Sequence, residues 1–160
     1  LGEYFSIMKP GTEAAYLETR LTEFMDRCRG AGMNLTPQRL TIYRALLEAK
    51  DHPSPEALYE RVRPGMPTLS LATIYKTLDT LAEMGLVTEL PATGDAKRYD
   101  ANMEHHHHLV CTGCGKVTDY HDAALDRIGL PKGLAGFRAR QVSVHIHGLC
   151  AECARAEKNH

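Results

Sequence analysis

The stretch from Asp100 to Asp119 constrains this chain more than any other part of its sequence. It places four consecutive histidines, one C-x-x-C pair and two aspartates within 20 residues. Because side chains alternate along a β-strand, a strand over residues 105–111 puts His106 and His108 on one face, where both could reach the same metal ion. The alternative interpretation is a polar edge strand whose histidines are simply solvated.

Two C-x-x-C pairs predict a four-cysteine zinc site, with the ligands Cys111, Cys114, Cys150 and Cys153. The pairs are separated by 35 residues, so a small folded module is expected between them. Glycines beside the first pair permit the tight turn that aims two thiolates at one point. The alternatives are a redox-active C-x-x-C and two disulfides, but no secretory signal indicates an oxidising compartment. The fifth cysteine, Cys28, lies on an apolar helical stripe and is interpreted as a core residue.

Length and composition permit one ordinary domain or two small ones, since the chain has 160 residues and 43% hydrophobic content. No apolar run approaches the roughly 20 residues of a membrane span, so we expect a soluble cytoplasmic protein without a membrane partner. The formal net charge is −1, and residues 1–100 carry 12 Lys/Arg against 14 Asp/Glu. Bulk charge therefore gives no argument for nucleic-acid binding, which would need a local patch or a bound metal.

Four helices and a hairpin are predicted for the first 100 residues. Glu13–Gly30 has helical apolar spacing, and the next three helices begin after hydroxyl N-caps, which are Thr36, Ser54 and Ser70. The last of them runs from Leu71 to Met84 and ends at Gly85. Residues 86–90 and 97–100 form two strands, with a turn at residues 93–95. This order of elements predicts a winged helix-turn-helix.

The fourth predicted helix has the composition of a recognition helix. Small hydroxyls, an aromatic ring and a cation project away from its apolar stripe near its N-terminus, at Thr73, Tyr75, Lys76 and Thr77. The alternative is an ordinary solvated helix face. The candidate DNA-binding residues are Tyr75, Lys76, Thr73 and Arg39.

The remaining chain predicts a second, smaller module. After a linker at residues 101–104, we expect strands at 105–111 and 117–120, a short helix at 122–128, a loop at 130–136 and a long strand at 137–147. The chain is thus predicted to be α+β. Its N-terminal winged helix-turn-helix domain (residues 1–100) precedes a small α/β dimerisation domain (residues 105–160) with the four-cysteine zinc site.

These features together resemble the ferric uptake regulator (Fur) family of bacterial metal-dependent repressors. The motifs that carry the resemblance are Thr36-Pro37-Gln38-Arg39, His52-Pro53, Ser70-Leu-Ala-Thr-Ile-Tyr75, Arg98-Tyr99-Asp100, His106-His-His108-Leu-Val-Cys111 and Cys150-Ala-Glu-Cys153. The resemblance implies a homodimer held by the C-terminal domain, a palindromic double-stranded DNA operator and a structural Zn²⁺ on the four cysteines. It also implies that Tyr75 contacts DNA.

The resemblance further implies a regulatory Fe²⁺ or Mn²⁺ ion between the domains, with the ligands His52, Asp100, His106, His108 and Asp119. Ferric-uptake repressors usually carry Glu at the last of these positions, whereas peroxide-stress regulators of the PerR type carry Asp. The chain is therefore most like the PerR branch. A further site of some Fur proteins would use His105 and His107 with Asp126; its usual last histidine is Val142 here, although His121, His145 or His147 could substitute.

The donor chemistry agrees with two different ions, because imidazoles with carboxylates suit Fe(II) or Mn(II), whereas four thiolates suit zinc. Five protein ligands leave one octahedral position open, where peroxide could meet Fe(II). The resemblance then implies conversion of His52 or His106 to 2-oxo-histidine, loss of the metal and release of DNA. Mn(II) would support repression without that oxidation.

Other functions stay open at this point. Within the same class, the chain could be an iron-responsive repressor of iron-uptake genes or, less in keeping with its ligands, a zinc or manganese uptake regulator. From other classes, it could be a non-haem iron oxygenase or a thiol redox switch. We expect a regulator and no enzyme, since no long substrate-binding domain accompanies the metal ligands.

Overall fold

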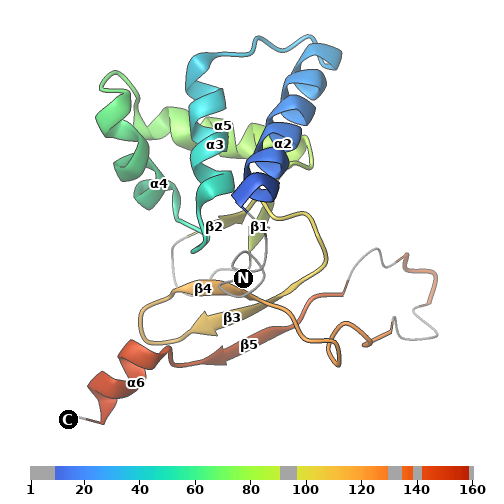
Figure 1. Cartoon of the computed structure of the whole chain (residues 1–160), viewed down its shortest axis with the longest axis vertical. Coiled ribbons are helices and arrows are strands. Elements are labelled where there is room, and N and C mark those ends of the chain that lie inside the picture. The colour runs from blue at the N-terminus through green and yellow to red at the C-terminus, as the bar shows by residue number, and fades with distance from the viewer. Residues whose placement is uncertain (1–9, 91–96, 130–134, 139–141, 159–160) are drawn as a thin grey trace. The chain divides into compact units, whose positions relative to one another are not determined.

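The computed structural model describes residues 10–90, 97–129, 135–138 and 142–158. The chain forms two compact units that divide between Met103 and Glu104. The first unit contains α2 (Pro10–Gly30), α3 (Pro37–Glu48), α4 (Pro55–Val62), the 3-10 turn η1 (Arg63–Gly65), α5 (Leu71–Glu83), β1 (Thr88–Leu90) and β2 (Arg98–Asp100). The second contains β3 (His107–Cys111), β4 (Val117–Tyr120), β5 (His145–Gly148) and α6 (Ala151–Glu157) (Figure 1).

Side-chain caps start three helices of the first unit where the sequence predicts them. The Thr36 hydroxyl accepts from the backbone N–H at the start of α3 at 3.3 Å, and Ser54 and Ser70 do the same for α4 and α5, each at 3.2 Å. Proline occupies the first turn of α3 and α4, where its missing N–H costs no helical hydrogen bond. At the other end of α5, Gly85 adopts φ +66°, a left-handed conformation that terminates a helix.

One apolar core holds the helices of the first unit together. It includes the T-shaped pair of Phe24 and Tyr43, whose ring centroids lie 5.1 Å apart, and the fully buried Ile74 and Leu78 of α5. Cys28 is also fully buried, and that burial raises the pKa of its thiol, so its predicted core role is confirmed. Antiparallel β1 and β2 follow α5, which completes the predicted winged helix-turn-helix. The predicted turn at residues 93–95 lies outside the described residues.

The second unit is built on a three-stranded sheet of order β4-β3-β5. Strand β3 runs antiparallel to β4 and parallel to β5, and it is therefore the central strand. This register places His108 opposite Asp119 on one side and His145 on the other. Val110 of β3 and Val117 of β4 are paired, and both are buried.

Residues 122–128 form turns where a short helix is predicted, so that prediction is wrong. The Asp122 carboxylate accepts from the backbone N–H groups of Ala124 and Leu125, at 2.7 and 3.3 Å. Aspartate favours such local turns over helix continuation, and a seven-residue segment gains few helical bonds after nucleation. The predicted loop at 130–136 lies mainly outside the described residues.

The predicted strand at residues 137–147 is also wrong in length, because β5 covers only His145–Gly148. Phe137 is 72% exposed, and residues 142–144 are not in a strand; residues 139–141 lie outside the described part. Pairing with β3 extends over four positions, from His108 to Cys111, and alternation alone cannot lengthen a strand without a partner. Helix α6 follows β5, in a segment for which no helix is predicted.

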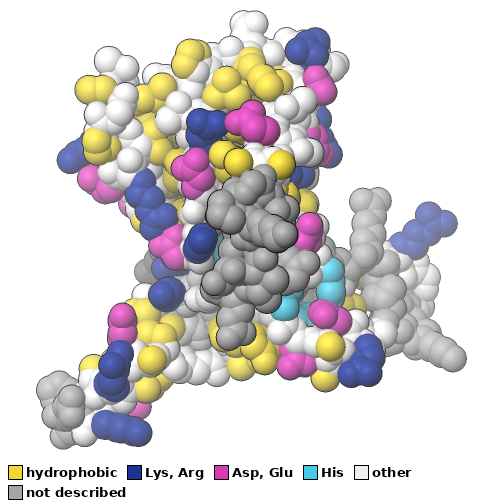
Figure 2. Space-filling model, viewed as in Figure 1, with side chains coloured by type: hydrophobic (Ala, Val, Ile, Leu, Met, Phe, Trp, Pro, Cys, Tyr) yellow, Lys and Arg dark blue, Asp and Glu magenta, His cyan; other side chains and the backbone are white. Residues whose placement is uncertain are grey.

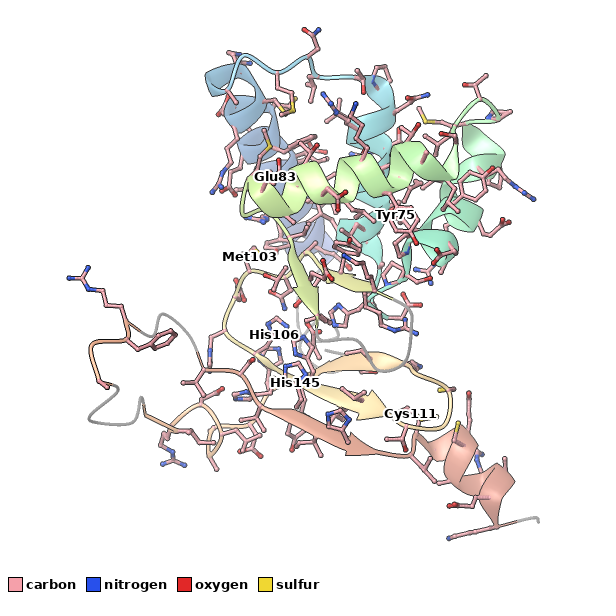
Figure 3. The ribbon with its side chains drawn as sticks, turned by 180° about the vertical axis from the view of Figure 1, so that it is seen from behind. Tyr75, Glu83, Met103, His106, Cys111 and His145 are labelled. Atoms are coloured by element: carbon pink, nitrogen blue, oxygen red, sulfur yellow. The ribbon has the colours of Figure 1, made fainter. Side chains whose placement is uncertain are left out.

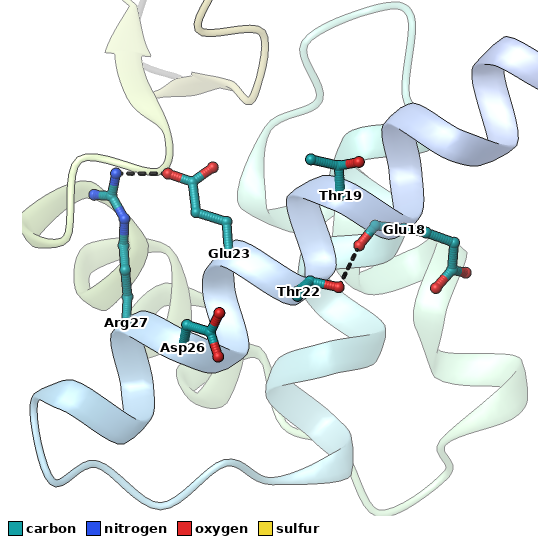
Figure 4. A pocket seen from close by; sticks show the side chains of 6 residues that line it. All are labelled: Glu18, Thr19, Thr22, Glu23, Asp26 and Arg27. Atoms are coloured by element: carbon teal, nitrogen blue, oxygen red, sulfur yellow. Dashed lines mark hydrogen bonds and ion pairs between the residues drawn. The ribbon is translucent and has the colours of Figure 1, made fainter.

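The surface of the helical unit mixes both signs of charge. On the face drawn in Figure 2, basic and acidic side chains are interspersed over the described residues. A shallow hollow of about 700 Å³ lies along α2, and its rim carries an ion pair between Glu23 and Arg27 at 2.6 Å (Figure 4). Within the described residues, no helix is both long and apolar enough to cross a membrane.

Candidate metal centres

Four cysteine sulfurs converge where β3 ends and α6 begins. Cys111 closes β3 (Figure 3), Cys114 follows in the turn, and Cys150 and Cys153 lie at the start of α6. Their Sγ atoms all lie within 4.8 Å of one another, and Cys114 and Cys150 are 3.9 Å apart. A disulfide needs about 2.05 Å, whereas zinc–sulfur bonds of about 2.3 Å place the sulfurs of a tetrahedral site about 3.8 Å apart. The four side chains are free thiols in an arrangement that fits zinc.

The glycine in the first knuckle is required by close packing. A Cβ atom at Gly113 would lie 3.0 Å from the Cys153 sulfur and 3.1 Å from the Leu149 side chain. Any larger residue at position 113 would push the two C-x-x-C segments apart. The glycine of the C-T-G-C sequence is therefore explained by the close approach of Leu149 and Cys153. Gly115 adopts φ +70°, which lets the chain turn back toward β4.

Hydrogen bonding shifts the pKa values of two cysteines in this cluster in opposite directions. The backbone N–H of Cys150 donates to the Cys111 sulfur at 3.2 Å, and with other N–H groups it lowers the pKa of that thiol to about 6. Hydrogen bonds with the neighbouring sulfurs, that of Cys150 above all, raise the pKa of Cys153 to about 12. Zinc binds thiolates, so its binding must displace the proton that Cys153 retains near neutral pH.

A second cluster joins β3 to β4. The Nε2 atoms of His106 and His108 lie 3.0 Å apart, and Asp119 Oδ1 lies 3.6 and 3.9 Å from them. All three side chains are at least 96% buried. Ligands at right angles around an ion, with bonds of about 2.1 Å, are separated by about 3.0 Å. The two imidazole nitrogens have the spacing of adjacent ligands of one ion, while the Asp119 oxygen lies farther from each, so the three donor atoms converge on one point without reaching full ligand spacing.

The tautomer of His106 suits a metal ligand. Its Nδ1 lies 2.8 Å from the carbonyl oxygen of Glu104, which can only accept, so Nδ1 carries the proton. The lone pair is then on Nε2, which faces Asp119 and accepts a hydrogen bond from His108 Nε2 at 3.0 Å, so an ion bound to both rings would replace that shared proton. A hydrogen bond from the nitrogen that does not bind the metal orients the imidazole ring and makes it a better ligand. Strand β3 begins at His107 rather than at the predicted residue 105.

Two further predicted ligands belong to the first unit. His52 Nδ1 lies 3.5 Å from Asp100 Oδ1, and both side chains are buried. His52 has φ +42°, a conformation that costs free energy for a non-glycine residue, and Arg98 holds its carbonyl oxygen at 3.0 Å. These contacts place an imidazole beside a carboxylate. That His52 and Asp100 share one ion with the cluster of the second unit stays a prediction.

A third group, formed by His105, His107 and Asp126, does not suit a metal. Asp126 Oδ1 lies 3.6 Å from His105 Nε2 and 3.1 Å from His107 Nε2. However, the backbone N–H of Val144 donates to His107 Nδ1 at 3.2 Å, so the ring proton is on Nε2. That Nε2–H donates to Asp126 and offers no lone pair to an ion. The fully buried His107 thus ties β3 to Val144 and to the turn around Asp126.

Two histidines proposed as substitutes for that third site lie beside the second cluster instead. The His145 ring is 5.0 Å from that of His108 and inclined by 34°, and the His121 ring is 6.0 Å from that of His106. Burial lowers the pKa of both His145 and His121, which favours neutral rings. The parallel register of β5 on β3 brings His145 to His108, and no sequence pattern specifies that register.

The candidate DNA-binding residues are divided between two helices. Tyr75 is half-buried and Lys76 exposed on α5, while Thr73 shares a 2.9 Å hydrogen bond with Ser70 at the start of that helix. Arg39 on α3 donates to the carbonyl oxygen of Asn34 at 2.6 Å. The predicted outward position of Thr77 is wrong.

Thr77 is 97% buried, because its position on α5 lies on the core side of the helix. One contact of Tyr75 is absent from the sequence prediction. Its hydroxyl donates to the carboxylate of Glu56 on α4, a residue that lies 19 positions away and belongs to no metal or DNA motif.

Sequence comparison identifies relatives along most of the chain. The profile of the ferric uptake regulator family matches residues 30–129. The peroxide-responsive repressor PerR of Staphylococcus epidermidis is 34% identical over 142 residues, which cover 88% of this chain and 95% of that protein.

Solved structures show the same architecture. The ferric uptake regulator Fur of Helicobacter pylori superposes with a TM-score of 0.69 at 22% identity, covering 86% of this chain and 93% of that one. A zinc uptake regulator complexed with zinc and DNA superposes with a TM-score of 0.58 at 25% identity, covering 89% and 97%.

Proposed function

The chain belongs to the ferric uptake regulator family, and from that membership we propose that it is a metal-dependent bacterial transcriptional repressor that senses peroxide by oxidation of its own histidine ligands. The observation that carries the proposal is the convergence of His106, His108 and Asp119 on one point, beside a separate four-thiol site. The four thiols are soft donors and the imidazoles and carboxylate are harder ones, so the two sets favour different ions, one structural and one regulatory. The 34% identity to a peroxide-responsive repressor supports the sensing role.

The proposed regulatory site combines ligands of both units. His52 and Asp100 from the first unit would complete the half-site of the second, for an Fe(II) or Mn(II) ion with three imidazoles and two carboxylates. The hydrogen bond from His106 to Glu104 would keep the His106 ring oriented when the ion leaves, and the bond from Arg98 to the His52 carbonyl oxygen would hold the backbone that carries the His52 ring. Each unit therefore contributes a preformed part of the site.

An Fe(II) ion held by these five residues would supply the redox chemistry that opens the O–O bond of peroxide, and any electron it lent would return to it from the histidine, which is the net reductant. The ligand histidine reacts at its C2 carbon: one peroxide oxygen becomes the 2-oxo group, and the other leaves as water. Histidine and hydrogen peroxide thus give 2-oxo-histidine and water, which balances atoms and electrons. His52 and His106 are the proposed targets. Oxidation converts an imidazole donor into a weaker amide-like one, so the site loses affinity for its ion.

Loss of the ion would release DNA for two physical reasons. A ligand set drawn from both units restrains the angle between them, and in a dimer that angle sets the spacing of the two recognition helices against DNA half-sites. The ion also neutralises the charge of two carboxylates in each chain. That matters here because the first 100 residues carry more acidic than basic side chains.

The exposed face of the second unit supports the proposed dimer. Leu109 on β3, Ile146 on β5 and the adjoining Leu149 are 37–43% exposed, although all three are large and apolar. They line a depression of about 270 Å³. A second copy that covers this face would bury a continuous apolar surface. The resulting two-fold symmetry would match a palindromic operator. We place the protein in the cytoplasm, where thiols stay reduced.

The decisive experiment is peptide mass spectrometry of the full-length protein after mild peroxide treatment. Protein loaded with Fe(II) should gain one oxygen atom on peptides containing His52 or His106 and should lose DNA binding in the same samples. Protein loaded with Mn(II) is the matched control and should do neither. Protein that binds DNA with Fe(II) and gains no oxygen would instead be an iron-responsive repressor.

A further inference from the structure

We propose that Glu56 is a positioning residue for Tyr75, and that it links the segment of the metal ligand His52 to the DNA-reading surface of α5. This inference rests on the proposed repressor function. It adds a residue that lies outside every motif of the family resemblance and concerns the first unit alone. Tyr75, Glu56 and His52 all belong to that unit, so the argument does not depend on where the second unit lies.

The contact itself is short and directional. The Tyr75 hydroxyl donates to Glu56 Oε1 at 2.5 Å, the length expected for a hydroxyl bound to a carboxylate. Glu56 lies in the first turn of α4. Tyr75 lies in the second turn of α5 (Figure 3). Both residues reach solvent. The bond therefore fixes the ring of a half-buried tyrosine on the helix that is expected to enter the major groove.

The charge states favour this bond near neutral pH. The hydrogen bond from Tyr75 is the main reason why the pKa of Glu56 lies below its usual value, and the same bond raises the pKa of the Tyr75 phenol. Glu56 is then ionised and Tyr75 protonated, as the bond requires. The Tyr75 hydroxyl has one proton to donate, so it cannot bind a phosphate without leaving Glu56. The Glu56 carboxylate also repels DNA phosphates.

A short stretch of chain with local hydrogen bonds connects Glu56 to the proposed metal ligand His52. Glu56 follows His52 by four residues, and between them the Ser54 hydroxyl caps α4 at the N–H of Ala57, at 3.2 Å. Asp51 pairs with Arg61 of the same helix through two contacts of 2.8 and 2.5 Å. The start of α4 and the His52 segment are thus held as one piece.

The same segment is both strained and anchored. His52 has φ +42°, and Arg98 of β2 donates to its carbonyl oxygen at 3.0 Å. A residue in an unfavourable conformation persists only where its surroundings hold it there, so the contacts of His52 couple its backbone to the segment around it. A rotation of His52 on metal binding would therefore move the first turn of α4, and with it Glu56 and the Tyr75 ring.

This arrangement gives a specific role to Glu56. With the bond intact, the Tyr75 ring presents its edge and face to the bases, where contacts discriminate sequence. Without Glu56, the hydroxyl is available to any phosphate, which strengthens binding to all DNA alike. Glu56 thus increases the preference for the operator over other DNA and makes that preference depend on the metal.

The test uses Mn(II), which avoids oxidation, and two duplexes. One duplex is selected from a random-sequence pool by the Mn(II)-loaded wild type, and the other has the same bases in shuffled order. For Glu56→Ala we expect the ratio of the two affinities to fall at least about five-fold, with a smaller difference between Mn(II)-loaded and chelated protein. Glu56→Gln retains an acceptor for Tyr75 and should keep most of the ratio.

Glu60→Gln is the matched control, because it removes the same charge from the same helix and leaves Tyr75 untouched. A ratio in Glu56→Ala equal to that in Glu60→Gln would overturn the inference. So would a Glu56→Ala effect of the same size in a Tyr75→Phe background, since Glu56 must act through the hydroxyl. If the wild type shows no metal-dependent preference at all, the proposed repressor function fails instead.

Discussion

His106 donates from Nδ1 to the carbonyl oxygen of Glu104 at 2.8 Å, and this bond decides what its other nitrogen can do. The next residue has the opposite tautomer, because His107 accepts at Nδ1 from the backbone N–H of Val144. Adjacent imidazoles in one histidine run thus have different chemistry. His106 presents a lone pair to the buried cluster, and His107 presents a proton to Asp126.

This difference predicts how many ions each chain binds. His105→Ala should leave the number of zinc and Mn(II) ions per chain unchanged, since His107 offers no lone pair to an ion beside it. His107→Ala should leave the Mn(II) site intact but lower the free energy of unfolding by roughly 2–4 kcal/mol, because it removes a buried ring and two hydrogen bonds. Elemental analysis of dialysed protein and thermal unfolding measure the two effects. Loss of one ion per chain in His105→Ala would restore a third metal site.

The pKa values of the cysteine cluster predict that zinc binding releases protons. Metal-free protein near neutral pH has a thiolate at Cys111, whose pKa is lowered to about 6, and a proton at Cys153, whose pKa is raised to about 12. Zinc displaces the latter proton, so its affinity should rise with pH. Calorimetry in two buffers of different ionisation enthalpy counts the protons.

Cys150→Ser should abolish this zinc binding together with the folding of the second unit, because the thiolates and the ion stabilise each other. Cys28→Ser is the matched control, since that thiol is buried in the first unit, far along the sequence from either knuckle. It should retain one zinc ion per chain. A Cys150→Ser protein that is folded and dimeric without zinc would contradict the structural role.

The exposed apolar residues of the sheet predict the dimer interface. Ile146→Glu on β5 should convert the protein to a monomer, because it would bury a charge in an apolar interface. Ile128→Glu is the control, as Ile128 is equally exposed at 47% against 43% but lies outside the strands. Analytical ultracentrifugation of the zinc-loaded proteins distinguishes the two. A dimeric Ile146→Glu protein would place the interface elsewhere.

Asp119 is predicted to set the response to peroxide. Aspartate is one methylene shorter than glutamate and holds its carboxylate differently at the ion. We therefore expect Asp119→Glu to keep metal-dependent DNA binding while His52 and His106 gain oxygen more slowly. His108→Ala is the companion variant, which should lose the metal response and stay dimeric. Equal oxidation of wild type and Asp119→Glu by limiting peroxide, counted by peptide mass spectrometry, would remove Asp119 from this role.

The sequence alone determines those features that depend on neighbouring residues. The hydroxyl caps at Thr36, Ser54 and Ser70 start their helices as predicted, because capping needs only residues within one turn. The C-x-x-C spacing likewise predicts that the thiols of one pair converge. In the first pair, the turn that joins Cys111 to Cys114 contains a glycine. The alternation of His106 and His108 follows from the strand period.

Tertiary structure decided whatever depends on a distant partner. The helix predicted at 122–128 is a set of turns, and the strand predicted at 137–147 is limited to the four positions that pair with β3. The ring tautomers of His106 and His107 depend on which backbone group meets each Nδ1, and the Glu56–Tyr75 bond depends on the packing of α4 against α5. Hydrogen bonds and strand pairing require a partner in space, and a partner far along the chain leaves no local pattern in the sequence.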